Sequence, residues 1–206
     1  MSAHENMEHA EHAEHAAHSN KKIALLISVL ALFLAFSETL GKSSQTAAVT
    51  ANVTSNDLWA FFQAKTIRMA VLSTAAEQMQ TEADRATDPD VKGRLLKTID
   101  GWKKNVARYD DDPASNEGRK QLSERAKHAE HERDEALARY HNYEFASAAF
   151  QIGIVLASAE VITSIVALGW LSGLVGLAGL GLMGLGLWAP HTLDFLLHAS
   201  HAAAAH

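Results

Sequence analysis

The chain has 206 residues, a formal net charge of −6 and no cysteine. The absence of cysteine excludes disulfide bonds, thiolate metal sites and a cysteine nucleophile. Residues 43–144 carry 15 Lys and Arg against 17 Asp and Glu, and this near balance leaves no basic surface suited to nucleic acid. We therefore expect no nucleic-acid partner.

The first two elements are a polar tail and an apolar run. The tail, residues 1–20, repeats Glu-His-Ala three times. Residues 21–42 follow, and their apolar stretch fits a membrane span, because about 20 apolar residues cross a bilayer core of roughly 30 Å. The end of this run lacks the small-x-small pattern of a signal-peptide cleavage site. We therefore predict a retained transmembrane helix at 21–42.

The middle of the chain, residues 43–144, favours helix throughout. Ala, Leu, Glu, Lys, Gln and Arg dominate it, and no stretch alternates apolar and polar residues with the period of two that a strand needs. Prolines and polar loops mark the helix ends, and Asp88 followed by Pro89 predicts a capping residue and a first-turn proline. They predict three helices, at about 44–86, 89–109 and 114–144.

These helices are predicted to form an extramembrane stalk that resembles a coiled coil. The third helix carries a seam with alternating spacings of three and four residues, typical of close helix packing. The seam consists of Leu122, Ala126, Ala129, Arg133, Ala136, Tyr140 and Tyr143. The first helix is apolar on every side, which predicts burial on every side. Further copies of the chain would cover the apolar surface of this helix that one chain leaves exposed, so a homo-oligomer is favoured over a compact monomer.

A thirteen-residue motif lies in that first helix. It begins at Asn56 and Asp57, includes Trp59, Phe62 and Gln63, and ends at Arg68. It resembles the Asn-Asp-x-Trp-Ala-x-x-Gln-Ala-Lys-x-x-Arg signature of domain-of-unknown-function family 4337. That resemblance implies a bacterial membrane protein with a His-rich tail, one span, a helical middle and a C-terminal pair of spans, and it implies no activity.

The residues of this motif have two interpretations. Trp59 and Phe62 are predicted to pack in an oligomer interface. Asn56, Asp57 and Gln63 either form a polar interlock or ligand contact, or they satisfy one another inside an oligomer core.

Two further apolar runs predict a second transmembrane helix at 145–169 and a third at 170–189. The third run is rich in glycine, which lets helices approach closely. Gly173, Gly176 and Gly179 are therefore predicted packing positions.

The second run carries one carboxylate, Glu160. Counting from Trp170, at about 1.5 Å per residue, places Glu160 near the middle of the membrane. Carboxylates at that depth are costly and face other helices. Two alternatives stay open. Glu160 either carries an ion or a proton, or it is a structural group bonded to Ser158, Ser164 or a backbone carbonyl.

The C-terminal tail, residues 190–206, contains a further group of candidate ligands. His191, Asp194, His198 and His201 share one helical face, and His with carboxylate at such spacing can bind zinc, nickel or copper. Low-complexity His tracts bind metal readily without a dedicated role, so solvated tails are the alternative. Apart from such a divalent metal, no cofactor is predicted.

No phosphate-binding loop or nucleophile elbow is present, so a non-enzymatic protein is predicted. The apolar runs favour a multi-pass membrane protein in contact with the lipid bilayer, and the family resemblance implies a bacterial one, which we expect in the inner membrane. We expect it to act as a self-associating helical scaffold. The first alternative is a channel, permease or proton-coupled component that uses Glu160. The second is a metal-buffering or metal-sensing protein that uses the His tails.

Overall fold

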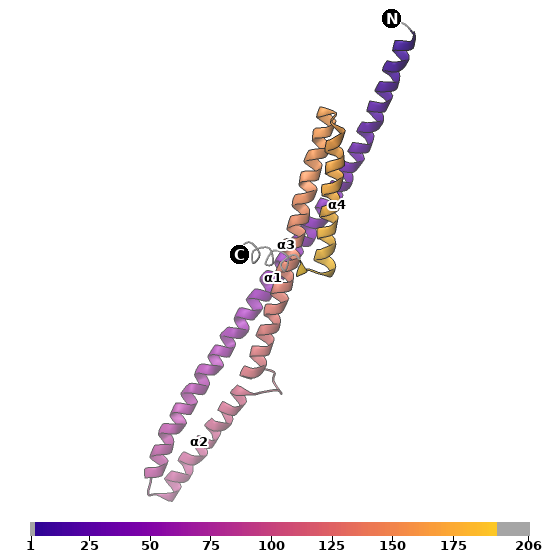
Figure 1. The fold of residues 1–206 in the computed structure, drawn as a ribbon. Helices are drawn as coiled ribbons and strands as arrows, with labels where there is room; N and C mark the ends of the chain where they lie inside the picture. Colours follow the sequence, from indigo (N-terminus) through magenta and orange to yellow (C-terminus); the bar gives the residue numbers. More distant parts are fainter. Residues whose placement is uncertain (1–2, 193–206) are drawn as a thin grey trace, which may run out of the picture. The chain divides into compact units, whose positions relative to one another are not determined.

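The computed structural model describes residues 3–192, and within that range the chain forms four α-helices and no strand (Figure 1). The helices are α1 (Ala3–Arg85), α2 (Pro89–Asp110), α3 (Arg119–Thr163) and α4 (Val166–Trp188). The prediction of an all-α fold is confirmed. Helices α1, α3 and α4 are each long and apolar enough to cross a membrane.

The chain divides into two compact units. The apolar unit contains residues 3–48 and 134–192, and the central unit contains residues 49–133. Both α1 and α3 contribute residues to both units, whereas α2 lies in the central unit and α4 in the apolar unit.

The core of the apolar unit forms where α1, α3 and α4 meet. Leu30 from α1 and Ala146 and Phe150 from α3 are buried there. The rings of Phe33 and Phe150 stack with centroids 6.0 Å apart. Half-buried apolar side chains from all three helices surround them, among them Leu182 of α4. Apolar burial of this kind is what holds the helices together in the described chain.

The central unit has two small cores. In the first, Ala76 and Ala83 of α1 pack against Ile99 of α2. In the second, Leu58 of α1 packs against Leu122 and Ala126 of α3. The predicted α3 seam is largely the buried side of that helix, because Leu122, Ala126, Ala129, Ala136 and Tyr143 are all buried.

Helix α1 is longer than predicted. The sequence suggested a span at 21–42 followed by a separate helix from about residue 44, but α1 runs from Ala3 to Arg85 without a break. Gly41 lies inside this helix. A single interior glycine costs only about 1 kcal/mol relative to alanine, and no proline stands nearby, so the helix continues through it.

Helix α2 begins and ends close to its predicted bounds. The Asp88 side chain caps it by accepting hydrogen bonds from the backbone N–H groups of Asp90 (2.8 Å) and Val91 (3.4 Å). Pro89 occupies the first turn, where its missing N–H costs nothing. The predicted cap and first-turn proline are therefore confirmed.

Helix α3 begins at Arg119 rather than at the predicted residue 114. The preceding loop is held by side chains: Gln121 accepts a hydrogen bond from the Asp112 backbone N–H (3.2 Å) and donates one to the Asp111 carboxylate (2.7 Å). Gly118 is required there, because a Cβ would lie only 2.9 Å from the Asp111 α-carbon. These contacts favour the loop over an earlier helix start.

The turn between α3 and α4 also differs from the prediction. The sequence placed the boundary between the second and third spans at residues 169 and 170, but α3 ends at Thr163 and α4 begins at Val166. Ser164 has a φ of 58°, a left-handed conformation that ends helices. Its backbone N–H donates to the Glu160 carbonyl (2.8 Å). Neither glycine nor proline marks this turn, so no residue type at this position predicted it.

Candidate functional site

Glu160 lies one helical turn before the end of α3. The mid-membrane depth expected from sequence assumed that the second span continued to about Leu168, and the earlier turn at Ser164 removes that assumption. Glu160 is nevertheless buried, with 6% of its surface exposed. The expectation that it faces other helices agrees with this burial.

The Glu160 carboxylate lies directly against the backbone of Gly169 on α4. A Cβ at residue 169 would stand 2.6 Å from the Glu160 Cδ and would overlap Oε2. Glycine therefore allows this approach of α4 to the carboxylate, whereas a larger residue would require the Glu160 side chain to shift. The glycine-rich composition of the third span was noticed in the sequence, but this pairing was not predicted.

The predicted serine partners do not bond this carboxylate. The Ser158 hydroxyl donates to the Ile154 carbonyl of its own helix (2.8 Å). Ser164 reaches Glu160 only through its backbone, at the turn described above. Glu160 Oε2 is buried and has no hydrogen-bond partner among the described residues. An unpaired buried polar atom is uncommon in a folded protein.

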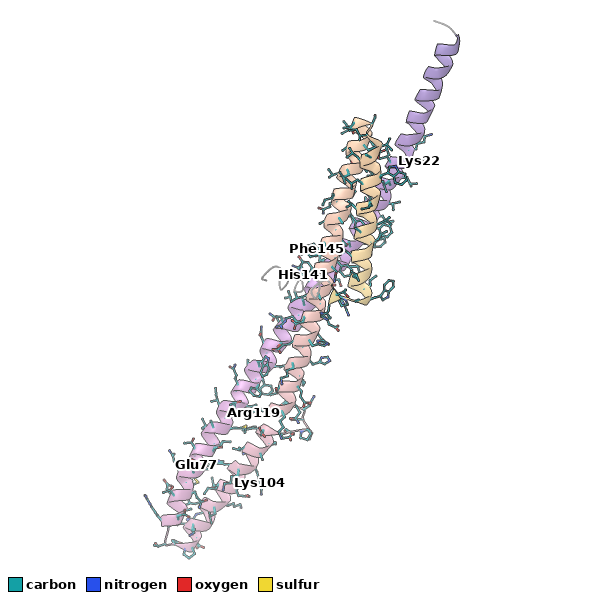
Figure 2. The ribbon with its side chains drawn as sticks, in the orientation of Figure 1. Lys22, Glu77, Lys104, Arg119, His141 and Phe145 are labelled. Atoms are coloured by element: carbon teal, nitrogen blue, oxygen red, sulfur yellow. The ribbon has the colours of Figure 1, made fainter. Side chains whose placement is uncertain are left out.

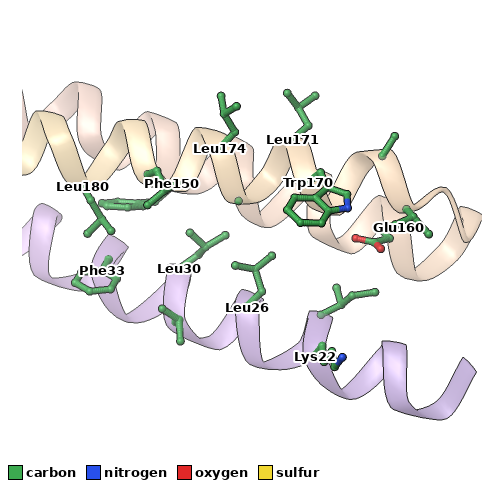
Figure 3. Close-up of a pocket in the computed structure, with 18 residues that line it drawn as sticks. Lys22, Leu26, Leu30, Phe33, Phe150, Glu160, Trp170, Leu171, Leu174 and Leu180 are labelled. Carbon is green, nitrogen blue, oxygen red and sulfur yellow. The ribbon is translucent and has the colours of Figure 1, made fainter. Parts of the chain in front are cut away.

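A groove of about 970 Å³ opens beside Glu160, between the first apolar part of α1 and helix α4 (Figure 3). Its two charged lining residues are Glu160 and Lys22. Figure 3 shows the Glu160 carboxylate near the ring of Trp170, with Lys22 on the facing helix. The other walls are apolar and include Leu26, Leu30, Phe33, Leu174, Leu177 and Leu180.

Two of the three predicted packing glycines make close helix contacts. A Cβ at Gly176 would lie 2.6 Å from a Leu30 methyl carbon, and one at Gly179 would lie 2.9 Å from the Phe150 ring. At Gly173 a Cβ would meet nothing within 4 Å. Gly176 and Gly179 thus pack within the chain, whereas Gly173 makes no such contact.

Small polar side chains join the helices of the apolar unit, and the sequence did not reveal them. The Ser37 hydroxyl donates to the Tyr143 carbonyl (2.9 Å), and the Ser172 hydroxyl donates to the Gly153 carbonyl (2.7 Å). The side-chain amide of Asn142 donates to the Pro190 carbonyl (2.8 Å). In an apolar setting these bonds fix how the helices lie against each other.

In the central unit, Trp59 and Phe62 pack within the chain. The Trp59 indole N–H donates to the Glu130 carboxylate (2.8 Å). The rings of Trp59 and Phe62 meet edge to face, with centroids 5.4 Å apart. The Arg119 guanidinium, labelled in Figure 2, lies 4.8 Å from the centroid of the Phe62 ring. The sequence assigned these two aromatics to an oligomer interface, and the described chain uses them as an internal α1–α3 contact.

Lys65 is a buried cation that the sequence did not single out. It is 6% exposed, and its Nζ lies 5.0 Å from the Phe61 centroid and 5.2 Å from that of Tyr109. The Glu117 carboxylate stands 3.9 Å away. Two aromatic faces and one carboxylate together offset the desolvation of the ammonium. The i, i+4 spacing of Phe61 and Lys65 could have predicted the contact between the Lys65 ammonium and the Phe61 ring.

On the opposite side of α1 in the central unit, an open line of residues carries no charge. We call it the exposed seam, defined by residues that are all solvent-accessible and spaced alternately four and three apart: Val49, Val53, Asn56, Ala60, Gln63, Ile67, Ala70 and Thr74. Ile67 is 64% exposed. The buried side of the same helix carries the other 3-4 series, which includes Ser55, Leu58, Phe62, Lys65 and Ala76.

Two of the three polar motif residues lie on the exposed seam. Asn56 and Gln63 lie on it seven residues apart, with Ala60 between them, and Asp57 is exposed beside Asn56. The three side chains therefore do not satisfy one another inside the core of a single chain. Whether they meet partners in an oligomer stays a prediction.

The predicted C-terminal metal ligands fall mostly outside the described residues. His191 is described and exposed, whereas Asp194, His198 and His201 lie beyond residue 192. Over the residues that the structure describes, no group of three His, Asp or Glu side chains is placed to hold a metal. Metal binding by the tails thus stays a prediction.

Comparison with known proteins gives one match. A family model described as a domain of unknown function (DUF4337) matches residues 19–189. No curated protein matches the chain, and no solved structure matches it. The match covers the three apolar runs, the central unit and the thirteen-residue motif.

Proposed function

Because the chain belongs to the DUF4337 family, whose description names no activity, we propose a function from its own residues. The protein is a non-enzymatic, multi-pass protein of the bacterial inner membrane. It self-associates through the exposed seam of α1 and serves as a membrane-anchored helical scaffold. The bacterial location follows from the resemblance of the motif around Trp59 to that family.

One observation supports the proposed self-association. Helix α1 has two series of residues with alternating spacings of three and four on opposite sides, and only one series packs against the rest of the central unit. A helix surface facing water normally carries charged residues. The exposed seam has none over residues 49–74. Its spacing is that of a left-handed coiled coil, in which two such helices interlock. A second copy of the chain supplies the same spacing and therefore the same fit.

The two amides in the seam favour an identical partner. A carboxamide has both donors and acceptors, so Asn56 and Gln63 each satisfy their own counterpart across a parallel pair of helices. A buried amide at one seam position fixes the register of a coiled coil at some expense of stability. Asn56 and Gln63 lie seven residues apart at equivalent positions, which makes a register shift by a fraction of a heptad unfavourable.

Single-cysteine cross-linking in membranes tests this proposal cleanly, because the chain has no native cysteine. Ile67→Cys lies on the exposed seam, and Arg68→Cys, its exposed neighbour, lies off it. We expect a covalent dimer from Ile67→Cys under mild oxidation and little from Arg68→Cys. Equal yields from the two variants would show collision rather than a seam contact and would contradict the proposal.

A second candidate function is ion or proton transport through Glu160. The buried Oε2 atom, which has no hydrogen-bond partner among the described residues, supports it, because intramembrane carboxylates often belong to ion pathways. Flux into liposomes that contain the purified protein tests it. Transport that disappears in Glu160→Gln supports the candidate, and flux that persists in that variant contradicts it.

A further inference from the structure

We propose that the groove beside Glu160 binds one molecule of an aminophospholipid. Its primary ammonium lies against the Glu160 carboxylate, its phosphate against Lys22, and one acyl chain along the apolar walls. This inference rests on the proposed membrane location, and it is independent of self-association through α1.

The depth of the two charged groups agrees with a lipid headgroup. Lys22 directly precedes the apolar run that begins at Ile23, and Glu160 lies one turn from the α3–α4 turn. Trp170, which also lines the groove, is 80% exposed. Lysine and tryptophan mark the membrane–water interface. All three side chains thus mark one end of the apolar helices.

The Glu160 carboxylate needs a hydrogen-bond donor that residues 3–192 do not provide. It is more than nine-tenths buried and lines the groove, and its Oε2 atom has no hydrogen-bond partner in the part of the chain that the structure describes. Within the described residues no ion pair joins it to Lys22. A primary ammonium carries three N–H donors and satisfies the carboxylate, while the adjacent phosphate satisfies Lys22.

The rest of the groove suits an acyl chain. Apart from Lys22 and Glu160, its lining is apolar, aromatic or glycine. Its volume of about 970 Å³ lies at the upper end of the roughly 300–1,000 Å³ typical of ligand sites. The walls run from Leu26 past Phe33 on α1 and from Leu174 to Leu180 on α4 (Figure 3). One end of the site is therefore charged and the other is apolar, as in a lipid.

The proposal predicts selectivity between two common headgroups. Phosphatidylethanolamine has a primary ammonium, whereas the quaternary ammonium of phosphatidylcholine has no N–H to donate. Choline is instead recognised by several aromatic faces, and here the charged end of the groove offers only Trp170. We expect the ethanolamine lipid to be retained about tenfold better, because charge-assisted hydrogen bonds are the stronger class.

Native mass spectrometry of the delipidated full-length protein, with the two lipids added at equal concentration, tests this. Glu160→Gln should lose the ethanolamine preference while still binding both lipids. Lys22→Gln should weaken both lipids equally, because both carry the phosphate. The matched control is Glu38→Gln, an exposed carboxyl on the same apolar part of α1, which should leave the preference unchanged.

Leu177→Trp provides a variant that does not touch the charged groups. Leu177 lines the groove and is 69% exposed, so a larger ring there should fill it and abolish retention of both lipids. Equal retention of both lipids by the wild-type chain overturns the proposal, as does an unchanged preference in Glu160→Gln. An oligomer that holds no lipid and dissociates in Leu177→Trp assigns the groove to a second copy and also overturns it.

Discussion

At residue 169 the absence of a side chain lets α4 reach the buried carboxylate of Glu160. The other glycines of α4 differ in this respect: Gly176 and Gly179 contact side chains of α1 and α3, and Gly173 meets open space. Glycine in a helix costs about 1 kcal/mol relative to alanine. That cost is offset only where a close approach uses the missing side chain.

We therefore expect Gly169→Ala to destabilise the chain by about 1–3 kcal/mol, the usual effect of overpacking. Gly173→Ala is the matched control, because the added methyl group meets nothing within 4 Å. It should be neutral or slightly stabilising. Thermal unfolding in detergent, followed by circular dichroism, measures both variants. A loss in Gly169→Ala that is not relieved by adding Glu160→Ala would contradict the assigned contact.

Asp111 gives a pH prediction outside the apolar helices. The hydrogen bond from Gln121, together with that from Lys120, lowers the pKa of this carboxyl below its ordinary value of 3.8. Its contribution to stability is therefore fully present above the ordinary pKa and is lost as the pH falls through the lowered value. Gln121→Ala should raise the pKa of Asp111 toward 3.8, measured by NMR titration. An Asp111 titration that is unchanged in this variant would show that Gln121 does not hold the carboxylate.

At the scale of elements, the turn at Ser164 sets where α3 ends and where Glu160 lies. The left-handed conformation costs a residue with a side chain about 1–2 kcal/mol, and glycine adopts it without that strain. Ser164→Gly should therefore stabilise the chain, while Ser158→Gly, inside α3, should destabilise it by about 1 kcal/mol. Chemical unfolding of the two variants checks this. The same sign of effect at both positions would contradict the assigned turn.

Some features of these helices were predictable from the sequence, and the turn at Ser164 was not. Asp88 and Pro89 start α2 as predicted, because a capping side chain and a first-turn proline act locally. The α3 seam was recognisable from its spacing for the same reason. The turn at Ser164 was not, since it depends on how α4 packs back on α3 and no glycine or proline marks it.

In the candidate site, too, the local feature was predictable from sequence and the contacts between distant residues were not. Glu160 stood out because a single carboxylate in an apolar run is visible in any sequence. Its contacts with Gly169 and the groove shared with Lys22 join residues far apart in the chain. No local pattern encodes such pairs. The depth assigned to Glu160 therefore stays a prediction, whereas the burial of its side chain agrees with the expectation that it faces other helices.

For the whole molecule, three membrane crossings would place residues 1–20 on one side and the central unit on the other. Lys21 and Lys22 favour a cytoplasmic start of the chain, whereas Arg133 and Arg139 favour a cytoplasmic central unit. The chain has no Lys or Arg after residue 139. Because every positive charge near the second span precedes it, we expect the central unit to be cytoplasmic.

Cysteine labelling in intact cells tests this topology directly. Ala114→Cys lies in the exposed α2–α3 loop, and it avoids Asn116, whose φ of 57° disfavours a side chain such as cysteine. Asn20→Cys reports on the side of the membrane that holds residues 1–20. A membrane-impermeant maleimide should label Asn20→Cys in intact cells and Ala114→Cys only after lysis. Labelling of both variants in intact cells would require an even number of crossings between them, and α1 would then not span the membrane.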